Sequence, residues 1–221
     1  MIFQSNQIIH GEAEAELAKL EDQCIDLIIT DPPYLVGYRD RTGRTIANDR
    51  NPDGVLPSIM QMYRVLKADR YAVLFCGWSA IAQFSAAWDA AGFRAVGHIM
   101  WAKDYASSSF HTHCRHESAW LLAKRRPAKP GAPVSDVMAW TYSGNRAHPT
   151  EKAVDILSPL VGAYSKPGDI VLDPFSGSGS TAVASALAGR RYLGIDVDER
   201  YCEHARRRLA GVHRRYDRKV A

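Results

Sequence analysis

The chain has 221 residues, 46% of them hydrophobic and 24% charged, with a formal net charge of +4. This composition is typical of a globular protein with a sizeable core, and the length fits one large domain or a compact domain with a small insertion. We expect neither a membrane span nor a signal peptide, because no long apolar run is present. The four cysteines are scattered, which disfavours a disulfide framework and favours a reducing cytoplasm.

Apolar runs and helical periodicities alternate along the chain. Strands are predicted at Gln7–His10, Ile25–Thr30, Tyr71–Cys76, Phe93–Lys103, Glu117–Lys124, Asp169–Asp173 and Arg191–Asp196. Helices are predicted at Glu12–Lys19, Val55–Lys67, Ala80–Ala91, Ala153–Tyr164, Thr181–Ala188 and Glu199–Leu209. This alternation indicates an α/β fold with a mostly parallel sheet covered by helices on both faces, and ligand sites in such sheets lie at the carboxyl ends of strands.

The segment Asp31-Pro32-Pro33-Tyr34 directly follows a predicted buried strand. Each proline fixes φ at about −65° and lacks an N–H, so the carbonyls of Asp31 and Pro32 can point into a cleft. A carboxylate beside a carbonyl offers two acceptors, which suits a planar amino group, and Tyr34 supplies a face for the ring that carries it. The pattern favours the exocyclic amine of a nucleobase, although Asp-Pro-Pro also occurs in ordinary turns.

A strand, a glycine loop and a helix start follow one another at residues 171–181. Gly177 and Gly179 let the backbone approach a ligand closely, and a hydroxyl of the next two residues can cap the helix. Asp196 ends the following strand about 20 residues later, where a carboxylate is the expected partner of ribose hydroxyls. The pattern predicts a nucleoside-binding β-α-β unit, and the absence of a third glycine in register weighs against a dinucleotide.

Together these motifs resemble the S-adenosylmethionine-dependent amino-methyltransferases that act on DNA. Asp31–Tyr34 matches their catalytic tetrad, and Asp173–Gly179 matches their cofactor loop. His148–Lys152 resembles the element that closes their cofactor pocket, with Ala153 at the family's proline, and Gly194–Tyr201 resembles the part that holds ribose and adenine. The tetrad precedes the cofactor loop, as in the permuted β group, and the resemblance covers nearly the whole chain.

The resemblance implies a Rossmann-like methyltransferase fold with permuted motif order, in a single domain over residues 1–221 with a small recognition insertion around 104–147. It implies S-adenosylmethionine as cofactor and methyl transfer to adenine N6, because the family's cytosine-N4 members more often carry serine at position 31. The implied catalytic residues are Asp31, Pro32, Pro33 and Tyr34. The implied cofactor-binding residues are Asp31, Thr150, Asp173, Phe175, Ser176, Gly177, Gly179 and Asp196.

Double-stranded DNA is the expected partner. Residues 35–53 are rich in arginine and follow the tetrad, so we expect a loop that folds over DNA and a flipped base. Residues 104–115 and 124–147 lie where the family has its target-recognition region; they are short, which makes a homodimer plausible. Phosphate contacts need local lysine and arginine clusters. The candidate DNA-binding residues are Arg39, Arg41, Arg44, Lys124, Arg125 and Arg126.

Other functions stay open at this point. The same tetrad could serve a cytosine-N4 methyltransferase or an RNA amine methyltransferase, and a non-catalytic DNA-binding relative could keep the fold. A nucleotide-dependent dehydrogenase is disfavoured by the truncated glycine pattern. The histidines and cysteine of residues 111–116 contain zinc-ligating atoms, but methyl transfer to an amine needs no metal and no second cysteine cluster is present, so we expect none.

Overall fold

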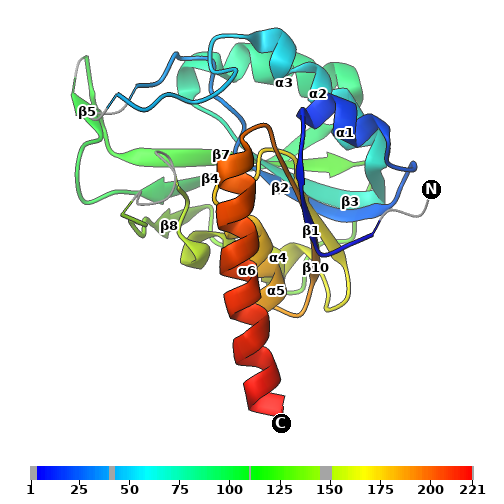
Figure 1. Ribbon diagram of the computed structural model, residues 1–221. Helices are drawn as coiled ribbons and strands as arrows, with labels where there is room; N and C mark the ends of the chain where they lie inside the picture. The colour runs from blue at the N-terminus through cyan, green and yellow to red at the C-terminus, as the bar shows by residue number, and fades with distance from the viewer. Residues whose placement is uncertain (1–3, 40–42, 110, 145–150, 221) are drawn as a thin grey trace.

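The computed structural model describes residues 4–39, 43–109, 111–144 and 151–220. Within these residues an eight-stranded sheet has the order β1-β10-β9-β2-β3-β7-β4-β8 (Figure 1). β7 runs antiparallel to both of its neighbours, and the other neighbouring strands pair in parallel. The strands are β1 (Gln7–His10), β2 (Ile25–Thr30), β3 (Leu66–Phe75), β4 (Arg94–Ala102), β7 (His116–Lys124), β8 (Val137–Ala139), β9 (Ile170–Asp173) and β10 (Arg191–Asp196). A separate hairpin pairs β5 (Ser108–Ser109) with β6 (His113–Cys114).

Helices cover both faces of the sheet (Figure 1). One face carries α1 (Ala13–Ala18), α2 (Pro57–Val65) and α3 (Ile81–Ala91), and the other carries α4 (Val154–Tyr164) and α5 (Ser180–Leu187). The last helix, α6 (Glu199–Val220), packs on α5 and β1, and short 3-10 turns lie at Pro52–Gly54 and Trp78–Ala80. None of the helices in the described residues is both long and apolar enough to cross a bilayer. The predicted α/β fold class is confirmed.

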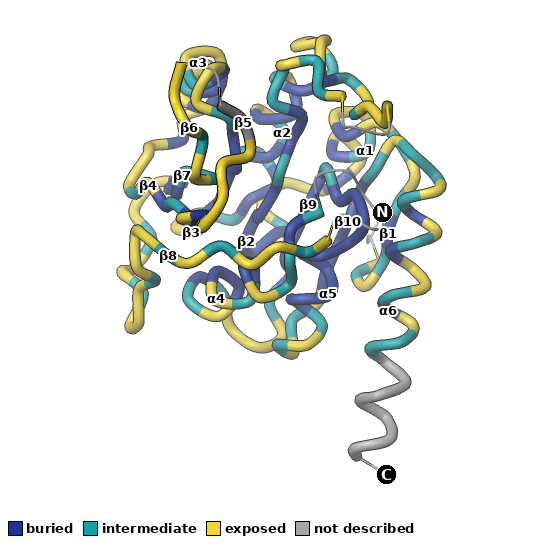
Figure 2. The backbone as a smooth tube through the Cα atoms, turned by 90° about the vertical axis from the view of Figure 1, so that its left-hand side faces the viewer, coloured by how far each residue is buried: buried dark blue, intermediate teal, exposed yellow. Residues whose placement is uncertain are grey.

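Strand β2 lies between two hydrophobic clusters, one on each face of the sheet. All six of its residues are buried, as the dark blue tube of β2 in Figure 2 shows. Ile28 packs with the cluster under α2 and α3, and Leu27 and Ile29 pack with the cluster under α4. Burial of one such side chain stabilises the fold by about 1.5–3 kcal/mol. The strand that carries the tetrad is therefore held firmly from both faces.

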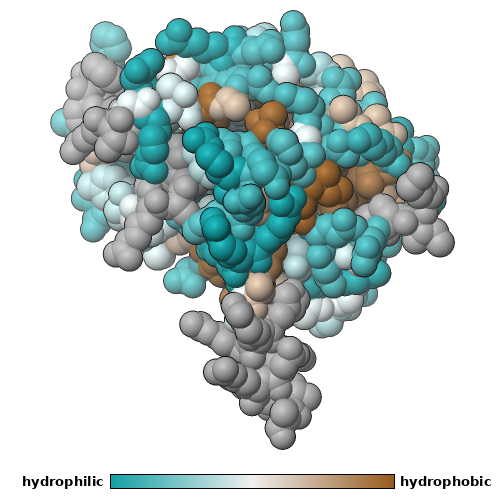
Figure 3. Space-filling view, viewed as in Figure 1, coloured by the Kyte–Doolittle hydropathy of each residue, from teal (hydrophilic) through white to brown (hydrophobic). Residues whose placement is uncertain are grey.

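Helix α6 is amphipathic. Cys202, Ala205 and Leu209 recur at helical spacing and are buried against α5 and β1. Up to residue 212 the opposite side of the helix is polar, and Figure 3 shows hydrophilic side chains over the outward surface of this part. The predicted helix end at Leu209 is too early, because the backbone remains helical to Val220.

The junction between α2 and β3 also differs from the sequence prediction. The helix predicted over Val55–Lys67 ends at Val65, and the strand predicted to begin at Tyr71 already begins at Leu66. Leu66 pairs with Ile25 of β2, so pairing with the sheet takes this backbone away from the helix. Tertiary contacts override helical periodicity at this junction.

Candidate active site

Three carboxylates meet at one edge of the sheet. Asp31 follows β2, Asp173 ends β9 and Asp196 ends β10. These three strands are parallel neighbours in the sheet, so their carboxyl ends lie side by side. Thr30 Oγ1 donates a hydrogen bond of 2.9 Å to Asp173 Oδ1 and thereby links the tips of β2 and β9. The tetrad and the glycine loop, about 140 residues apart in the sequence, are thus neighbours in space.

Two cavities open at this edge and share Asp31, Phe175 and Gly177. The first cavity is also lined by Thr30, Phe75, Lys152, Asp173, Ser176, Ser178, Ser180 and Thr181, among others. The second cavity is also lined by Glu12, Pro33, Thr45, Ile46, Ala47, Asn48, Asp196, Asp198 and Tyr201, among others. The structure therefore joins the predicted catalytic and cofactor segments in one cleft.

Both oxygens of the Asp31 carboxylate accept hydrogen bonds. The Tyr34 hydroxyl donates to Oδ1 at 2.7 Å, and the Lys152 ammonium donates to Oδ2 at 2.5 Å. Burial raises the pKa of Tyr34 well above 10, with a further contribution from the Asp31 charge, so the hydroxyl stays protonated and donates. Burial lowers the pKa of Lys152, but the charges of Asp31 and Glu117 outweigh it and raise the pKa overall, so Lys152 is a cation.

Asp173 is a buried carboxylate without a cationic hydrogen-bond partner among the described residues. Its Oδ1 accepts from Thr30 Oγ1 and from the backbone N–H of Phe175. Burial raises the pKa of Asp173 to about 7, and the hydrogen bonds only partly oppose this shift. Asp173 can therefore change its protonation state near neutral pH.

The glycine loop needs its glycines for two different reasons. Gly177 has a φ of 49° and Gly179 a φ of 80°, in the left-handed region where a side chain is strained. In addition, a Cβ at Gly179 would lie 2.6 Å from Ala205 Cβ of α6. Gly179 is the N-cap of α5, and no side chain caps this helix, so the predicted hydroxyl cap is wrong.

The loop offers unused polar groups to a ligand. Ser176 Oγ is buried and has no hydrogen-bond partner among the described residues. The N–H groups of the first turn of α5 have no partner within the helix. Asp196 Oδ2 accepts from Gly177 N at 2.7 Å, which holds the carboxylate of the second cavity against the loop. This donor and acceptor set fits S-adenosylmethionine, which combines ribose hydroxyls with a charged amino acid end.

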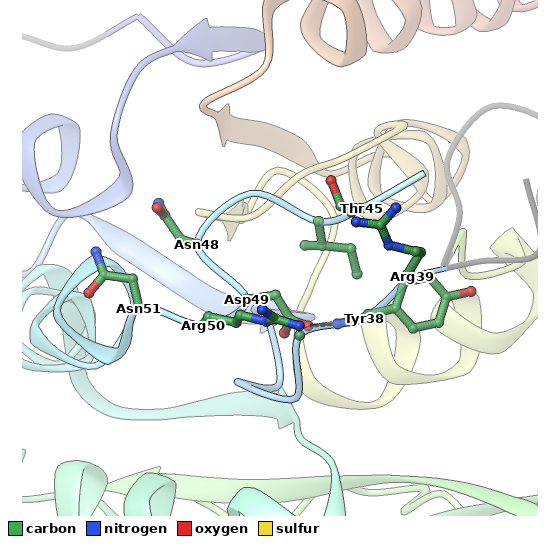
Figure 4. Close-up of a pocket in the computed structure, with 9 residues that line it drawn as sticks. Tyr38, Arg39, Thr45, Asn48, Asp49, Arg50 and Asn51 are labelled. Carbon is green, nitrogen blue, oxygen red and sulfur yellow. Dashed lines mark hydrogen bonds between the residues drawn. The ribbon is translucent and has the colours of Figure 1, made fainter. Parts of the chain in front are cut away.

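Asp49 organises the loop that follows the tetrad (Figure 4). Its buried carboxylate accepts from the backbone N–H groups of Leu35 at 2.9 Å and Tyr38 at 2.5 Å. The same loop places residues 45–48 in the wall of the second cavity. We expected this loop to fold over DNA; in the structure this part of it lies against the second cavity.

The predicted DNA-binding residues fall in two separate regions. Arg39 and Arg44 are exposed on the loop after the tetrad, and Arg39 forms an isolated bridge with Thr45. Arg41 and Thr150, two of the predicted site residues, lie outside the described residues. Arg39 and Arg44 thus belong to the same loop as the wall of the second cavity.

Lys124 is wrongly predicted as a DNA contact. Its side chain is buried, and its Nζ donates at 2.6 Å to the carbonyl oxygens of both Tyr63 and Leu66. Strand β7 is antiparallel to β3, so its end at Lys124 pairs with Arg70 near the amino end of β3. Arg125 and Arg126 follow at this opposite edge of the sheet, away from the tetrad.

The other predicted site residues lie at the cleft or beside it. Pro33 lines the second cavity, and Pro32 is buried beside it. Tyr34 reaches the cleft through its hydroxyl, and Gly179 acts as the helix cap. Lys152 was not predicted as a partner of Asp31; the only signal in the sequence was its place in the His148–Lys152 motif.

Comparisons with known proteins agree with this geometry. A family model for N6 and N4 methyltransferases, described as DNA methylase, matches residues 25–207. The chain belongs to the N6/N4 DNA methylase family. YubD of Escherichia coli (strain K12) is 49% identical to this methylase over 209 residues, which cover 95% of this chain and 92% of YubD. The DNA adenine methyltransferase YhdJ of the same strain is 28% identical, with 93% of this chain and 83% of YhdJ covered.

Solved structures share the fold of this DNA methylase. The M1.HpyAVI–SAM complex superposes with a TM-score of 0.73 at 23% identity, covering 92% of this chain and 98% of M1.HpyAVI. The cytosine-N4-specific PvuII DNA methyltransferase superposes with a TM-score of 0.73 at 16% identity, covering 90% of this chain and 84% of the PvuII enzyme. The predicted Rossmann-like methyltransferase fold is confirmed.

Proposed function

We propose that this DNA methylase transfers a methyl group from S-adenosylmethionine to the N6 amine of adenine at a short site in double-stranded DNA. The observation that carries the proposal is the meeting of the tetrad and the glycine loop in a cleft where Asp31, Phe175 and Gly177 line both cavities. The motif order supports assignment to the permuted β group. S-adenosylmethionine supplies an electrophilic methyl group when it is bound.

The second cavity and the glycine loop would hold the cofactor. Asp196 is placed to accept from ribose hydroxyls, since its carboxylate lines the cavity beside Gly177. Ser176 Oγ and the first turn of α5 provide donors for the amino acid end. Phe175 lies between the two cavities and can pack against the cofactor. Thr150 is assigned to this pocket from the motif resemblance alone.

The tetrad would activate the amine. A base inside a duplex is out of reach, so the target adenine must rotate out of the helix. Stacking on Tyr34 would stabilise the extruded base by about 1–3 kcal/mol. Asp31 and the Pro32 carbonyl would accept the two N6 hydrogens, which localises the lone pair on nitrogen as the transition state forms. The negative charge of Asp31 would also stabilise the positive charge that develops on that nitrogen as the bond between the methyl group and sulfur breaks, and the nitrogen would then release one proton to Asp31 or to water.

Aromatic side chains continue the same edge of the sheet beyond Tyr34 and support a DNA partner. Trp78 is 71% exposed and follows Gly77, at which a Cβ would lie 3.0 Å from the Tyr34 ring. Tyr105 and Tyr142 follow β4 and β8, are both exposed, and form an edge-to-face pair with ring centroids 6.2 Å apart. Such rings provide stacking surfaces for bases. We assign them to DNA contact within the recognition insertion at 104–147, together with Trp78.

Cytosine N4 is the second candidate acceptor. Adenine is favoured by the aspartate at position 31 and by the similarity to YhdJ. Cytosine is favoured by the PvuII enzyme, whose fold matches this chain with the same TM-score as M1.HpyAVI. Both bases present a planar amino group, so the tetrad chemistry fits either one.

The decisive experiment is methyl transfer by the purified protein from isotopically labelled S-adenosylmethionine to duplex DNA and, in parallel, to RNA. Nucleosides from each digest are separated and identified by mass spectrometry. We expect labelled N6-methyladenine from DNA. Labelled N4-methylcytosine would replace the proposal with the second candidate. Label confined to RNA, or binding of S-adenosylmethionine without any transfer, would contradict the proposal.

A further inference from the structure

We propose that Lys152 is a positioning residue for methyl transfer: its ammonium fixes one oxygen of the Asp31 carboxylate, so that the other oxygen can accept a hydrogen from the target amine. The inference rests on the proposed function and assigns a new role within the same cleft. It concerns a contact between two segments 121 residues apart in the chain.

Among the described residues, Asp31 is the hydrogen-bond partner of the Lys152 ammonium. The side chain is only 8% exposed, and its Nζ lies 2.5 Å from Asp31 Oδ2. The same nitrogen lies 5.1 Å from the centroid of the Phe75 ring and 5.8 Å from that of Tyr34. Aromatic faces attract a cation but provide no hydrogen-bond acceptor comparable to a carboxylate. The ammonium is therefore directed at Asp31.

Charges of alternating sign continue from this pair. Lys103 at the end of β4 forms an ion pair with Glu117 near the start of β7. The charge of Glu117 in turn acts on Lys152 and raises its pKa against the effect of burial. The order Lys103, Glu117, Lys152, Asp31 gives each partly buried charge a neighbour of opposite sign, which offsets the cost of removing it from water.

Loss of the Lys152 charge would weaken Asp31 as a hydrogen-bond acceptor. In a variant without this ammonium, the partly buried Asp31 carboxylate would lack its cationic partner while the acidic group of Asp173 stays close by, and both effects favour a protonated carboxyl. A protonated carboxyl donates a hydrogen bond through one oxygen and is a poorer acceptor for an amine. Lys152 thus orients the group that meets the substrate.

The two partners of Asp31 differ in how easily they can be displaced. Lys152 is enclosed beside Phe75, whereas the Tyr34 hydroxyl belongs to the ring that would stack on the base. Movement of this ring would free Asp31 Oδ1 for the N6 hydrogen while Oδ2 stays bound to Lys152. Before a base binds, the Tyr34 hydroxyl therefore occupies Asp31 Oδ1, and Lys152 keeps the carboxylate in the orientation that the reaction needs.

The test compares Lys152→Met and Lys152→Arg with Lys124→Met, a matched control that removes a buried lysine from the opposite edge of the sheet. For each variant, kcat, the KM for DNA, the calorimetric Kd for S-adenosylmethionine and the pH profile of kcat are measured. We expect Lys152→Met to lower kcat about 100-fold, to move the acid limb of its profile by about one pH unit or more to higher pH, and to leave the cofactor Kd within about twofold. Lys152→Arg should return the acid limb to its original position, and Lys124→Met should lower the melting temperature without moving the profile.

Two results would overturn the inference. The first is a Lys152→Met enzyme with the parent kcat and pH profile. The second is a raised cofactor Kd with a normal kcat at saturating S-adenosylmethionine, which would make Lys152 a ligand of the cofactor carboxylate. If Lys152→Met does not fold, Glu117→Gln decides: loss of this charge should move the basic limb to lower pH, and an unchanged profile would contradict the role. A parent enzyme without transfer activity would instead contradict the proposed function.

Discussion

Two carboxylates at neighbouring strand tips have different electrostatic environments, although both lie in the same cleft. Asp31 has the Lys152 ammonium on one oxygen. Among the described residues Asp173 has only neutral hydrogen-bond donors, and burial raises its pKa to about 7. Environments that separate two acidic groups in this way often assign them different roles in a reaction. Here Asp31 is paired with Lys152, as its proposed contact with the amine requires, and Asp173 connects β2 to β9 through Thr30.

The raised pKa of Asp173 predicts a pH dependence of stability. Between about pH 4 and pH 7 the folded protein holds a proton on Asp173 that the unfolded chain has released. This contribution to stability is complete at low pH and is lost as the pH rises, by up to roughly 1.4 kcal/mol per pH unit. In Asp173→Asn the residue no longer titrates, and its amide oxygen can still accept from Thr30 and Phe175.

The measurement is the free energy of unfolding in urea at several pH values from about 4.5 to 7.5. We expect the stability of the parent protein, relative to Asp173→Asn, to fall as the pH rises across this window. Curves that stay parallel would show that Asp173 does not titrate there. Far-ultraviolet circular dichroism of both proteins controls for a change in fold.

Single residues also show where sequence reasoning fails. Lys124 stands in a basic cluster in the sequence, yet its ammonium is buried under backbone carbonyls. A cluster of basic residues in the sequence does not reveal the direction of the strand that carries it. Because β7 is antiparallel to β3, Lys124 lies at the edge of the sheet opposite the tetrad. The ion pair between Lys152 and Asp31 could not be predicted from the sequence either, because it joins segments 121 residues apart in the chain.

At the scale of elements, the glycine loop depends on close packing between its helix and α6. A methyl group at Gly179 would meet Ala205 Cβ at 2.6 Å and would also be strained by the positive φ. Gly189 after α5 has a φ of 72° but open space around its Cβ position, so it isolates the cost of the backbone conformation. The two positions therefore form a matched pair for mutation.

We expect Gly179→Ala to lower the free energy of unfolding by about 2–4 kcal/mol, because overpacking adds to conformational strain, and Gly189→Ala to lower it by about 1 kcal/mol. Urea denaturation measures both values. Gly179→Ala should also weaken S-adenosylmethionine binding, since the loop must shift to relieve the contact. Equal losses for the two variants would show that α6 does not constrain the loop.

Element identities could be predicted from the sequence more reliably than element ends. Strand Arg191–Asp196 and strand Gln7–His10 have the predicted bounds, because turn residues and apolar runs mark them clearly. The start of β3 could not be found, since Leu66 continues the apolar periodicity of α2 and only its pairing with Ile25 turns it into a strand. Such pairing depends on distant residues and leaves no local signal.

At the scale of the whole molecule, the order of the strands in the sheet brings the tetrad and the glycine loop together. β9, β10 and β2 are parallel neighbours, so motifs from the two ends of the chain reach the same edge of the sheet. The sequence could predict this edge from the acidic residues that follow its strands. It could not predict the ion pairs across the edge or the position of residues 45–48 in the wall of the second cavity, because these depend on loop paths.

The central claim is that Asp31 acts directly in methyl transfer to DNA. The most direct test is the single-turnover transfer rate of Asp31→Ala at saturating S-adenosylmethionine and DNA, with Asp155→Ala, an exposed aspartate on α4, as the control. Loss of the acceptor should lower the rate about 100- to 1000-fold with the fold intact, while the control keeps the parent rate. An Asp31→Ala protein that methylates DNA at the parent rate would contradict the account.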